Sequence, residues 1–326
     1  MLQYLRRGAN GDEAVDASEA TPPSDRPVIG LALGGGAARG FAHIGVIRTL
    51  VEKGLVPDVI TGTSIGAVVG GCYAAGRLDN LEQWGLKLTR RRVLGYLDVS
   101  FTGSGLINGA RLTEQLANEV GEIMIEALPH RFAAIATEIG TGHEIWLTRG
   151  RLVDALRASY ALPGIFSPVD IGGRWLMDGA LVNPVPVSAA RALGARLVIA
   201  VNLNADLFGR GTTIHDHGPE RELVTETVKA AIAEGKVNAA KAAKRQILGK
   251  PGRPGLTTVM MDAFNVMQDR ITRARLAGDP PDVMVNPRLA PIGLFDFHRA
   301  NEAIALGAEA TERAIEPLAE ALTALA

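Results

Sequence analysis

The first part of the chain alternates between short apolar runs and stretches with helical periodicity. Residues 28–33 are continuously apolar, which is typical of a strand buried on both faces. The next stretch predicts a helix whose apolar face consists of Ile44, Ile47, Leu50 and Val51. A second apolar run at 59–61 precedes another helical stretch at 67–75. Because strand and helix alternate, we expect a parallel sheet with right-handed crossover connections.

The rest of the chain adds elements to this pattern. Helical periodicity covers 81–96, 111–120 and 257–276, and a last helix is expected over 297–325, with a bend at Pro317. Strand-like runs lie at 132–139, 144–147, 196–202 and 282–285. The first two of these runs flank Gly140-Thr141-Gly142, which predicts a hairpin.

The pattern changes character over residues 206–278. The beginning of this segment reads as a loop, its middle is rich in alanine and lysine, and residues 249–255 have the composition of a linker. We therefore expect one α/β domain over residues 27–326, interrupted by a helical insertion at about 206–278.

Composition and charge bound the setting in which the protein works. The chain has 326 residues, of which 47% are hydrophobic and 21% charged, as in a globular protein. Its formal net charge of -1 gives no global field that would draw it to nucleic acid or to an anionic membrane. The single cysteine, Cys72, excludes an intramolecular disulfide framework and fits a reducing cytoplasm.

The N-terminal segment and the apolar runs limit contact with membranes. Residues 1–26 carry charges but no apolar block, so we expect a disordered leader that is not a signal peptide. No apolar run reaches the ~18 residues that a membrane-spanning helix needs. Any membrane contact would then be peripheral, at the inner membrane.

A serine between two glycines stands at a predicted strand-to-helix junction. The pentapeptide Gly62-Thr63-Ser64-Ile65-Gly66 has the arrangement of a nucleophile elbow. Glycine at the flanking positions Gly62 and Gly66 lets the backbone turn tightly, and the serine hydroxyl then projects into a cleft at the helix N-terminus. With 38 glycines in the chain, the pentapeptide alone could arise by chance, so its context must decide.

A glycine-rich loop follows the first predicted strand. This loop, residues 34–40, begins like a dinucleotide-binding fingerprint, but its last glycine position falls on Arg39 and no acidic residue closes the next strand. A phosphate-binding Walker loop is excluded because no Gly-Lys-Ser/Thr follows. Exposed amides at a helix start can instead stabilise a developing oxyanion, and a purely structural turn is the alternative.

A third segment, residues 175–180, is an apolar run that ends in Asp178-Gly179-Ala180. It places the Asp178 carboxylate at the end of a strand, where open α/β sheets keep their ligand crevices. Taken alone, Asp-Gly is usually a turn. Because a neutral serine needs a base to become a nucleophile, Asp178 is a candidate for that base.

The six histidines offer other candidate bases. We expect His43 to pack beneath the glycine loop. His215 and His217 flank Asp216 in a loop, where a metal site is conceivable but is the less favoured interpretation. His298 alone stands in the chain order of an α/β-hydrolase triad, but its phenylalanine neighbours favour packing or capping.

Together the motifs resemble the patatin-like phospholipases, in the bacterial branch related to neuropathy target esterase. The resemblance covers residues 28–202 and resumes at 279–308. Besides the three motifs above it rests on Ala136-Thr137-Glu138, Thr141-Gly142, Arg157-Ala158-Ser159, Pro163-Gly164-Ile165-Phe166-Ser167-Pro168 and Asn183-Pro184-Val185-Pro186-Val187.

The resemblance implies a three-layer αβα sandwich with a mostly parallel sheet, and a Ser-Asp dyad in place of a triad. Ser64 would be the nucleophile and Asp178 the base, next to Gly179 and Ala180. The oxyanion hole would come from loop amides, with Gly34, Gly35, Gly36, Ala37 and Arg39 as candidates. The loop has one residue more than the usual Gly-x-Gly-x-x-Gly, so the amide that faces the oxyanion is left open. No cofactor, metal or calcium is expected.

The implied substrate is an acyl-ester lipid, a phospholipid or a lysophospholipid. The apolar residues near the motifs could line an acyl groove or belong to the core: Ile65, Leu162, Ile165, Phe166 and Leu181. Basic clusters at 90–92 and 241–253 could meet anionic headgroups or be solvated helix faces. The insertion could serve as a lid or as a contact in a homo-oligomer.

Two other classes of function remain open at this stage. An acyltransferase of the malonyl-transacylase type would use a serine elbow but would need a catalytic histidine and an arginine. A noncatalytic scaffold would keep the glycine turns without needing both Ser64 and Asp178. The presence of both residues favours hydrolysis of an acyl ester.

Overall fold

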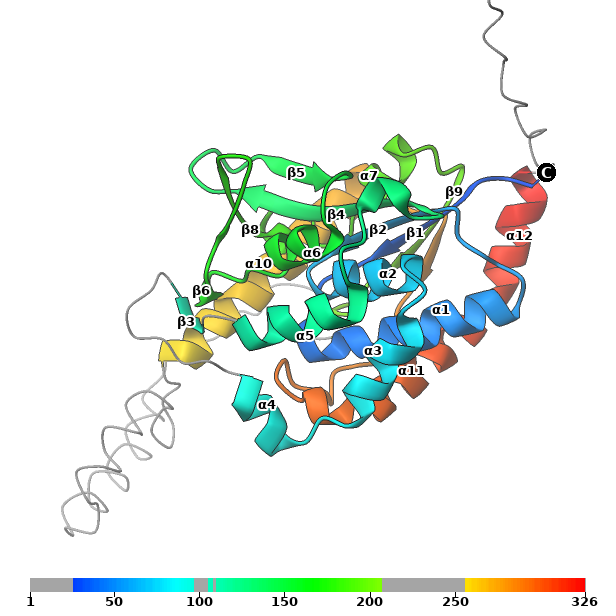
Figure 1. The fold of residues 1–326 in the computed structure, drawn as a ribbon. Helices are drawn as coiled ribbons and strands as arrows, with labels where there is room; N and C mark the ends of the chain where they lie inside the picture. Colours follow the sequence, from blue (N-terminus) through cyan, green and yellow to red (C-terminus); the bar gives the residue numbers. More distant parts are fainter. Residues whose placement is uncertain (1–25, 97–104, 108–109, 207–255, 326) are drawn as a thin grey trace, which may run out of the picture.

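The fold is built around one mostly parallel sheet with helices on both faces (Figure 1). It is seen in a computed structural model that describes residues 26–96, 105–107, 110–206 and 256–325. Residues 1–25 of the predicted leader at 1–26 and most of the predicted insertion at 206–278 lie outside these residues. Of the insertion, the structure describes Asp206 and the helix α10 (Leu256–Gly278).

The central sheet has eight strands in the order β10-β9-β1-β2-β4-β8-β7, and β5 pairs with β4. Five strands run parallel: β10 (Val283–Val285), β9 (Leu197–Val201), β1 (Ile29–Leu33), β2 (Val59–Thr63) and β4 (Arg131–Glu138). Three strands run antiparallel to their neighbours: β5 (Glu144–Leu147), β8 (Arg174–Asp178) and β7 (Val169–Ile171). A separate pair joins β3 (Gly105–Ile107) to β6 (Gly164–Phe166).

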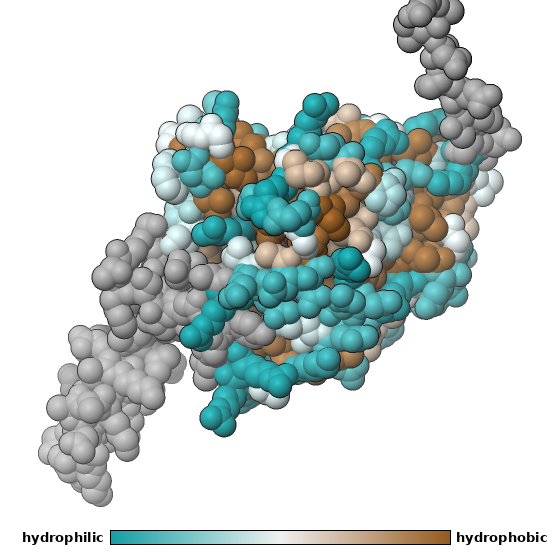
Figure 2. All heavy atoms as spheres, viewed as in Figure 1, coloured by the Kyte–Doolittle hydropathy of each residue, from teal (hydrophilic) through white to brown (hydrophobic). Residues whose placement is uncertain are grey.

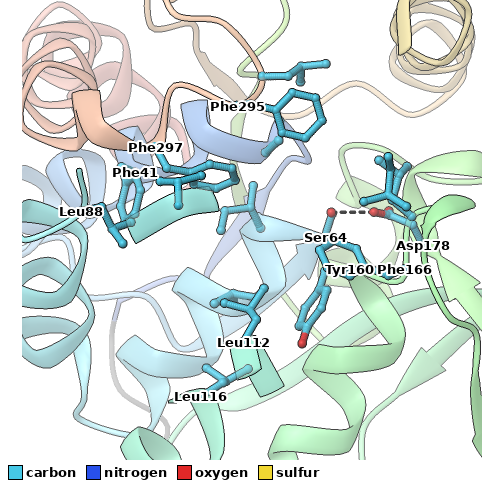
Figure 3. Close-up of a pocket in the computed structure, with 18 of the residues that line it drawn as sticks. Phe41, Ser64, Leu88, Leu112, Leu116, Tyr160, Phe166, Asp178, Phe295 and Phe297 are labelled. Carbon is cyan, nitrogen blue, oxygen red and sulfur yellow. Dashed lines mark hydrogen bonds between the residues drawn. The ribbon is translucent and has the colours of Figure 1, made fainter. Parts of the chain in front are cut away.

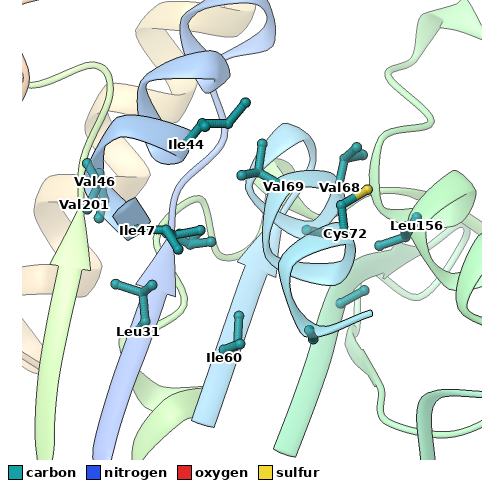
Figure 4. Close-up of a cluster of buried hydrophobic side chains, with 14 of the residues drawn as sticks. Leu31, Ile44, Val46, Ile47, Ile60, Val68, Val69, Cys72, Leu156 and Val201 are labelled. Carbon is teal, nitrogen blue, oxygen red and sulfur yellow. The ribbon is translucent and has the colours of Figure 1, made fainter. Parts of the chain in front are cut away.

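One face of the sheet carries most of the helices and the larger core. Alternate residues of β1, Leu31 and Leu33, pack there against Ile47 of α1 (Ala42–Glu52) and Val69 of α2 (Ile65–Ala74) (Figure 4). The other helices of this core are α3 (Leu78–Leu86), α5 (Ala110–Val120), α6 (Leu152–Ser159), α11 (Ala300–Glu312) and α12 (Ile315–Leu325). In Figure 2 the outer sides of α3 and α5 are mainly hydrophilic, as amphipathic helices require.

The opposite face is covered by α7 (Val187–Ala192) and the end of α10. Ala32 and Ala200, on β1 and β9, point to this side and pack with Val187 and Ala190 of α7. Leu276 of α10 packs against the same cluster. Helices on both faces of the sheet give the three-layer αβα sandwich that the resemblance implied, and they explain why β1, β2 and β9 are continuously apolar.

Several predicted boundaries need correction. The helix expected at 81–96 is two helices, α3 and α4 (Arg90–Tyr96). The predicted last helix is also divided into α11 and α12, because the chain turns at Arg313 and Ala314. Pro317 does not mark this division: it lies in the first turn of α12, where the missing N–H of proline breaks no helical hydrogen bond. Val51 is 38% exposed, so the predicted apolar face of α1 is one residue too wide.

Several short elements were not predicted: β3, β6, β7, α6 and α7. All five have three to eight residues, too few to show a clear period. The predicted hairpin of β4 and β5 is confirmed. Within the described part of the chain, no helix is both long and apolar enough to cross a bilayer.

Candidate active site

Ser64 stands at the junction of β2 and α2 with a strained backbone. Its backbone φ of 56° and ψ of -124° lie in a region that residues other than glycine rarely adopt. A Cβ at Gly62 would lie 2.5 Å from the Ala67 nitrogen, and one at Gly66 would lie 2.2 Å from the Leu33 oxygen. Both glycines are therefore required by close approach, as the sequence predicted for a nucleophile elbow.

Asp178 accepts a hydrogen bond from the Ser64 hydroxyl. The Ser64 Oγ and Asp178 Oδ2 atoms are 2.6 Å apart (Figure 3). The other carboxylate oxygen, Oδ1, accepts from the Ala180 N–H at 2.9 Å, which fixes the orientation of the carboxylate. The structure thus brings together two side chains that are far apart in the sequence.

The strand that carries Asp178 reaches the site from an unexpected direction. β8 runs antiparallel to β4, so its carboxyl end points away from the edge where the parallel strands end. Asp178 nevertheless lies at that edge, because it pairs with Ala136, one residue beyond the Ile135 that pairs with Thr63. Asp178 therefore lies at the end of a strand beside the crevice, as expected. It does so because β4 extends past β2 and because β8 ends at Asp178.

Burial makes the Asp178 carboxylate a stronger base. The residue is 2% exposed, and desolvation raises its pKa to about 6, against the opposing effect of the hydrogen bonds from Ser64 and Ala180. A carboxylate with this pKa is mostly ionised at neutral pH and is a much better proton acceptor than an exposed aspartate. No further residue is needed to explain how Ser64 could be deprotonated.

Two amides of the glycine loop are available for a ligand. The N–H groups of Gly34 and Gly35 donate to the carbonyls of Val201 and Pro184, each at 3.0 Å. The Arg39 N–H donates to the Gly36 carbonyl at 3.1 Å within the 3-10 helix Ala37–Phe41. Of the five candidate amides, those of Gly36 and Ala37 have no acceptor among the described residues. The set of candidates therefore narrows to these two.

Buried side chains hold this loop from below. His43 lies within hydrogen-bond distance of the Gly34 carbonyl, 2.8 Å from its Nε2, as expected from the sequence. Complete burial lowers the pKa of His43 to about 4, so the ring is neutral and donates through Nε2. The buried Arg39 donates to the Ile292 carbonyl at 2.8 Å and to Asn204 Oδ1 at 3.3 Å.

The site lies in a deep, predominantly apolar pocket (Figure 3). Its lining includes Ser64, Asp178, Gly36 and Ala37. Val68 and Cys72 of α2 line it along the helix that starts at Ser64. Opposite walls come from α3, α5, α10 and the segment at 294–297, including Leu81, Leu112, Leu116, Met261, Phe295 and Phe297. A pocket of this kind accommodates a flexible hydrocarbon chain whose polar end lies at Ser64.

Four of the five apolar residues considered for an acyl groove line this pocket: Ile65, Leu162, Ile165 and Phe166. Leu181 is not among the lining residues. Cys72 is a buried thiol, and desolvation raises its pKa to about 12, so it is unreactive as expected.

The histidines do not complete a triad. His298 accepts a hydrogen bond from Arg90 Nε at 3.2 Å and lies 4.0 Å from Asp296, so it belongs to a surface cluster. No histidine lines the pocket in the described part of the chain. The metal site considered at His215 and His217 lies outside the described residues, and the described ones contain no cluster that could hold a metal.

Three residues near the site carried no signal of their own in the sequence. Ser159 contacts the Ser64 backbone, Asn204 contacts the glycine loop, and Gln268 of α10 lines the pocket. In the sequence, Ser159 stands out only as the last residue of the motif Arg157-Ala158-Ser159. Neighbouring polar residues on a helix or after a strand give no indication of which tertiary partner they meet.

Comparison with known proteins agrees with this geometry. A family model described as patatin-like phospholipase matches residues 31–191, which include the glycine loop, Ser64 and Asp178. An uncharacterized NTE family protein of Mycobacterium bovis is 34% identical over 336 residues, which cover 90% of this chain and 92% of the relative. The chain belongs to the patatin-like phospholipase family.

Other relatives of this patatin-like protein are much longer and match it over a shorter segment. Patatin-like phospholipase domain-containing protein 7 of Rattus norvegicus is 35% identical over 184 residues, which cover 54% of this chain but only 14% of that protein. A patatin-like phospholipase domain-containing protein of Caenorhabditis elegans is 36% identical over 199 residues and is likewise covered to 14%. Membership of the patatin-like family implies a lipid acyl hydrolase.

Proposed function

We propose that the protein is a serine esterase that hydrolyses acyl esters of phospholipids or lysophospholipids through a Ser64-Asp178 dyad. The observation that carries this proposal is the 2.6 Å contact between Ser64 Oγ and Asp178 Oδ2 at the polar end of an apolar pocket. A hydroxyl that donates to a buried carboxylate of raised pKa is ready to lose its proton as it attacks a carbonyl.

The reaction would proceed in two steps. Ser64 Oγ attacks the ester carbonyl carbon while Asp178 takes the hydroxyl proton, and the Gly36 and Ala37 amides stabilise the negative oxygen of the tetrahedral intermediate. When the intermediate collapses, the bond to the alcohol breaks and Asp178 returns the proton to the leaving oxygen. A water molecule then attacks the acyl-enzyme, with Asp178 again as base, and releases the fatty acid.

The pocket favours this reaction over the other classes. A malonyl-transacylase needs a histidine base and an arginine for its acid substrate, and neither residue type lines the pocket in the described part of the chain. A scaffold has no use for a strained serine backbone, which costs stability. An acyl-ester lipid is therefore the proposed partner. A cytoplasmic location, peripheral contact with the inner membrane and a homo-oligomer remain predictions.

The test is turnover of a p-nitrophenyl acyl ester, a lysophospholipid and a phospholipid by the wild type, Ser64→Ala and Asp178→Asn. We expect both variants to lose activity by several orders of magnitude, and fluorophosphonate to label the wild type but not Ser64→Ala. Ser188→Ala and Asp170→Asn, which change the same residue types outside the pocket, are the controls and should keep wild-type rates. Wild-type rates in both dyad variants would end the proposal.

A further inference from the structure

Gln268 brings a buried side-chain amide from α10 to the dyad. The residue is 4% exposed and lines the same pocket as Ser64. A Cβ placed on Gly35 would lie 3.6 Å from Gln268 Nε2 and 3.6 Å from Ser64 Cβ, so these two atoms lie no farther apart than twice that distance. Gln268 Nε2 has no acceptor among the described residues. Nε2 is not one of the fully buried side-chain atoms that lack a partner, so it reaches the open space of the pocket, where a bound ligand can supply its acceptor.

The orientation of this amide is fixed by a chain of hydrogen bonds. Arg39 can only donate, and its Nη1 is 3.3 Å from Asn204, so Asn204 must present its oxygen Oδ1 to it. Asn204 Nδ2 then faces the other way and donates to Gln268 Oε1 at 3.4 Å. Gln268 therefore has its oxygen toward Asn204, and its Nε2 is free to point toward the site.

The same asparagine orients the glycine loop. Asn204 Nδ2 also donates to the Gly35 carbonyl oxygen at 3.2 Å. Since C=O and N–H point in opposite directions across a trans peptide, this contact turns the Gly36 N–H away from Asn204. Asn204 thus orients two N–H donors. It orients the backbone amide of Gly36 through its contact with the Gly35 carbonyl, and the side-chain amide of Gln268 through its contact with Oε1.

We propose that Gln268 is a third hydrogen-bond donor to the carbonyl oxygen of the reacting ester, beside the amides of Gly36 and Ala37. This inference rests on the proposed esterase function. As Ser64 attacks, the carbonyl oxygen becomes negative, and Gln268 Nε2–H donates to it without changing its own protonation. A donor already oriented by buried partners stabilises this charge more than water would, because it need not reorient during the reaction.

The test compares two variants with a matched control. Gln268→Glu keeps an oxygen toward Asn204 but replaces the donor with an acceptor, and Gln268→Met removes the polar group. Gln83→Met makes the same change at an exposed position of α3 outside the pocket. We expect kcat to fall roughly tenfold to a thousandfold in both Gln268 variants with KM little changed, and the control to stay near the wild type.

The choice of substrates separates two roles. A p-nitrophenyl ester and an alkyl ester of the same acyl chain form the same oxyanion, but only the alkoxide needs protonation to leave. An equal loss of kcat on both esters is the expected result. A loss confined to the alkyl ester, a change in KM alone, or wild-type rates would overturn the role of Gln268. If Gln268→Glu does not fold by circular dichroism, the same criteria apply to Gln268→Met.

The two proposals can fail separately. If the wild type cleaves both esters, Ser64→Ala cleaves neither, and Gln268→Met equals the wild type, then only the Gln268 inference fails. If the wild type cleaves neither ester and fluorophosphonate does not label Ser64, the esterase proposal fails and the Gln268 inference falls with it.

Discussion

The Ser159 hydroxyl holds the backbone of Ser64. Ser159 Oγ accepts the Ser64 N–H at 2.9 Å and donates to the Ile135 carbonyl at 2.6 Å. Ser159 is fully buried at the end of α6, and Ile135 lies in β4. The strained backbone of Ser64 is therefore tied to two elements, α6 and β4, that are not adjacent to it in the chain.

Replacing Ser159 by alanine should misplace Ser64, the proposed nucleophile. The change leaves the Ser64 N–H and the Ile135 carbonyl without their partner, which should cost about 1–3 kcal/mol of unfolding free energy. We expect kcat to fall about tenfold to a hundredfold with KM nearly unchanged, and fluorophosphonate labelling to slow in parallel. Ser159→Thr, which keeps the hydroxyl, should restore most of kcat, and Ser167→Ala is the control. An equal loss of kcat in Ser159→Thr would argue for packing alone.

Activity should depend on pH through Asp178. The pKa of this carboxylate is raised to about 6, and only the ionised form can accept the Ser64 proton. The value of kcat/KM for a p-nitrophenyl ester should therefore rise with pH, pass its midpoint near 6 and level off above about 7. A profile that is flat from pH 5 to 8, or that falls as pH rises, would contradict this role.

The same pKa shift predicts that Asp178 destabilises the fold at neutral pH. An unfolded aspartate ionises near 3.9, whereas Asp178 in the folded protein holds its proton up to about pH 6. Between these values the folded state binds more protons, so its stability falls as pH rises, by about 3 kcal/mol in total. Asp178→Asn avoids this loss and should unfold at higher urea above pH 7, with a much smaller difference at pH 4. A constant difference from pH 4 to 8 would exclude this origin.

Asn204→Asp should disturb the oxyanion loop without breaking the contact to Arg39. The aspartate can still accept from Arg39, but it has no donor for the Gly35 carbonyl or for Gln268 Oε1. We expect kcat to fall by at least tenfold, because the Gly36 amide loses its fixed direction. Asn202→Asp is the control, since the Asn202 side-chain oxygen that accepts the Asn204 N–H persists in the aspartate. Equal kcat values in the two variants would count against the role of Asn204.

The face of α2 that lines the pocket should set the length of the acyl chain. Val68 and Cys72 follow Ser64 at intervals of four residues, so they lie about 6 and 12 Å along the helix from the nucleophile. Val68→Phe should restrict hydrolysis to short p-nitrophenyl esters, and Cys72→Phe should exclude only longer ones. Cys72→Ser leaves the space open and serves as the control. Identical chain-length profiles for both phenylalanine variants would place the acyl chain elsewhere.

Much of the fold and the pairing of Ser64 with Asp178 could be predicted from the sequence. Continuous apolar runs at β1, β2 and β9 report burial on both faces, and this information is local to each strand. The elbow could be predicted because close approach excludes all side chains at Gly62 and Gly66, which leaves a visible glycine pattern. Pairing Ser64 with Asp178 needed the chemical requirement for a base and the family resemblance.

Only the tertiary structure decided how the parts of the site meet. Which loop amides remain free depends on the carbonyls of Val201, Pro184 and Gly36, whose positions follow from the packing of separate elements. The antiparallel course of β8 and the length of β4 place Asp178, although an apolar run looks the same in either direction. Three supporting residues lie far apart in the sequence: Ser159, Asn204 and Gln268. Each meets its hydrogen-bond partner only because the sheet and α10 hold the two residues in place. The local pattern of the chain thus determined the serine turn, and the fold decided which groups support it.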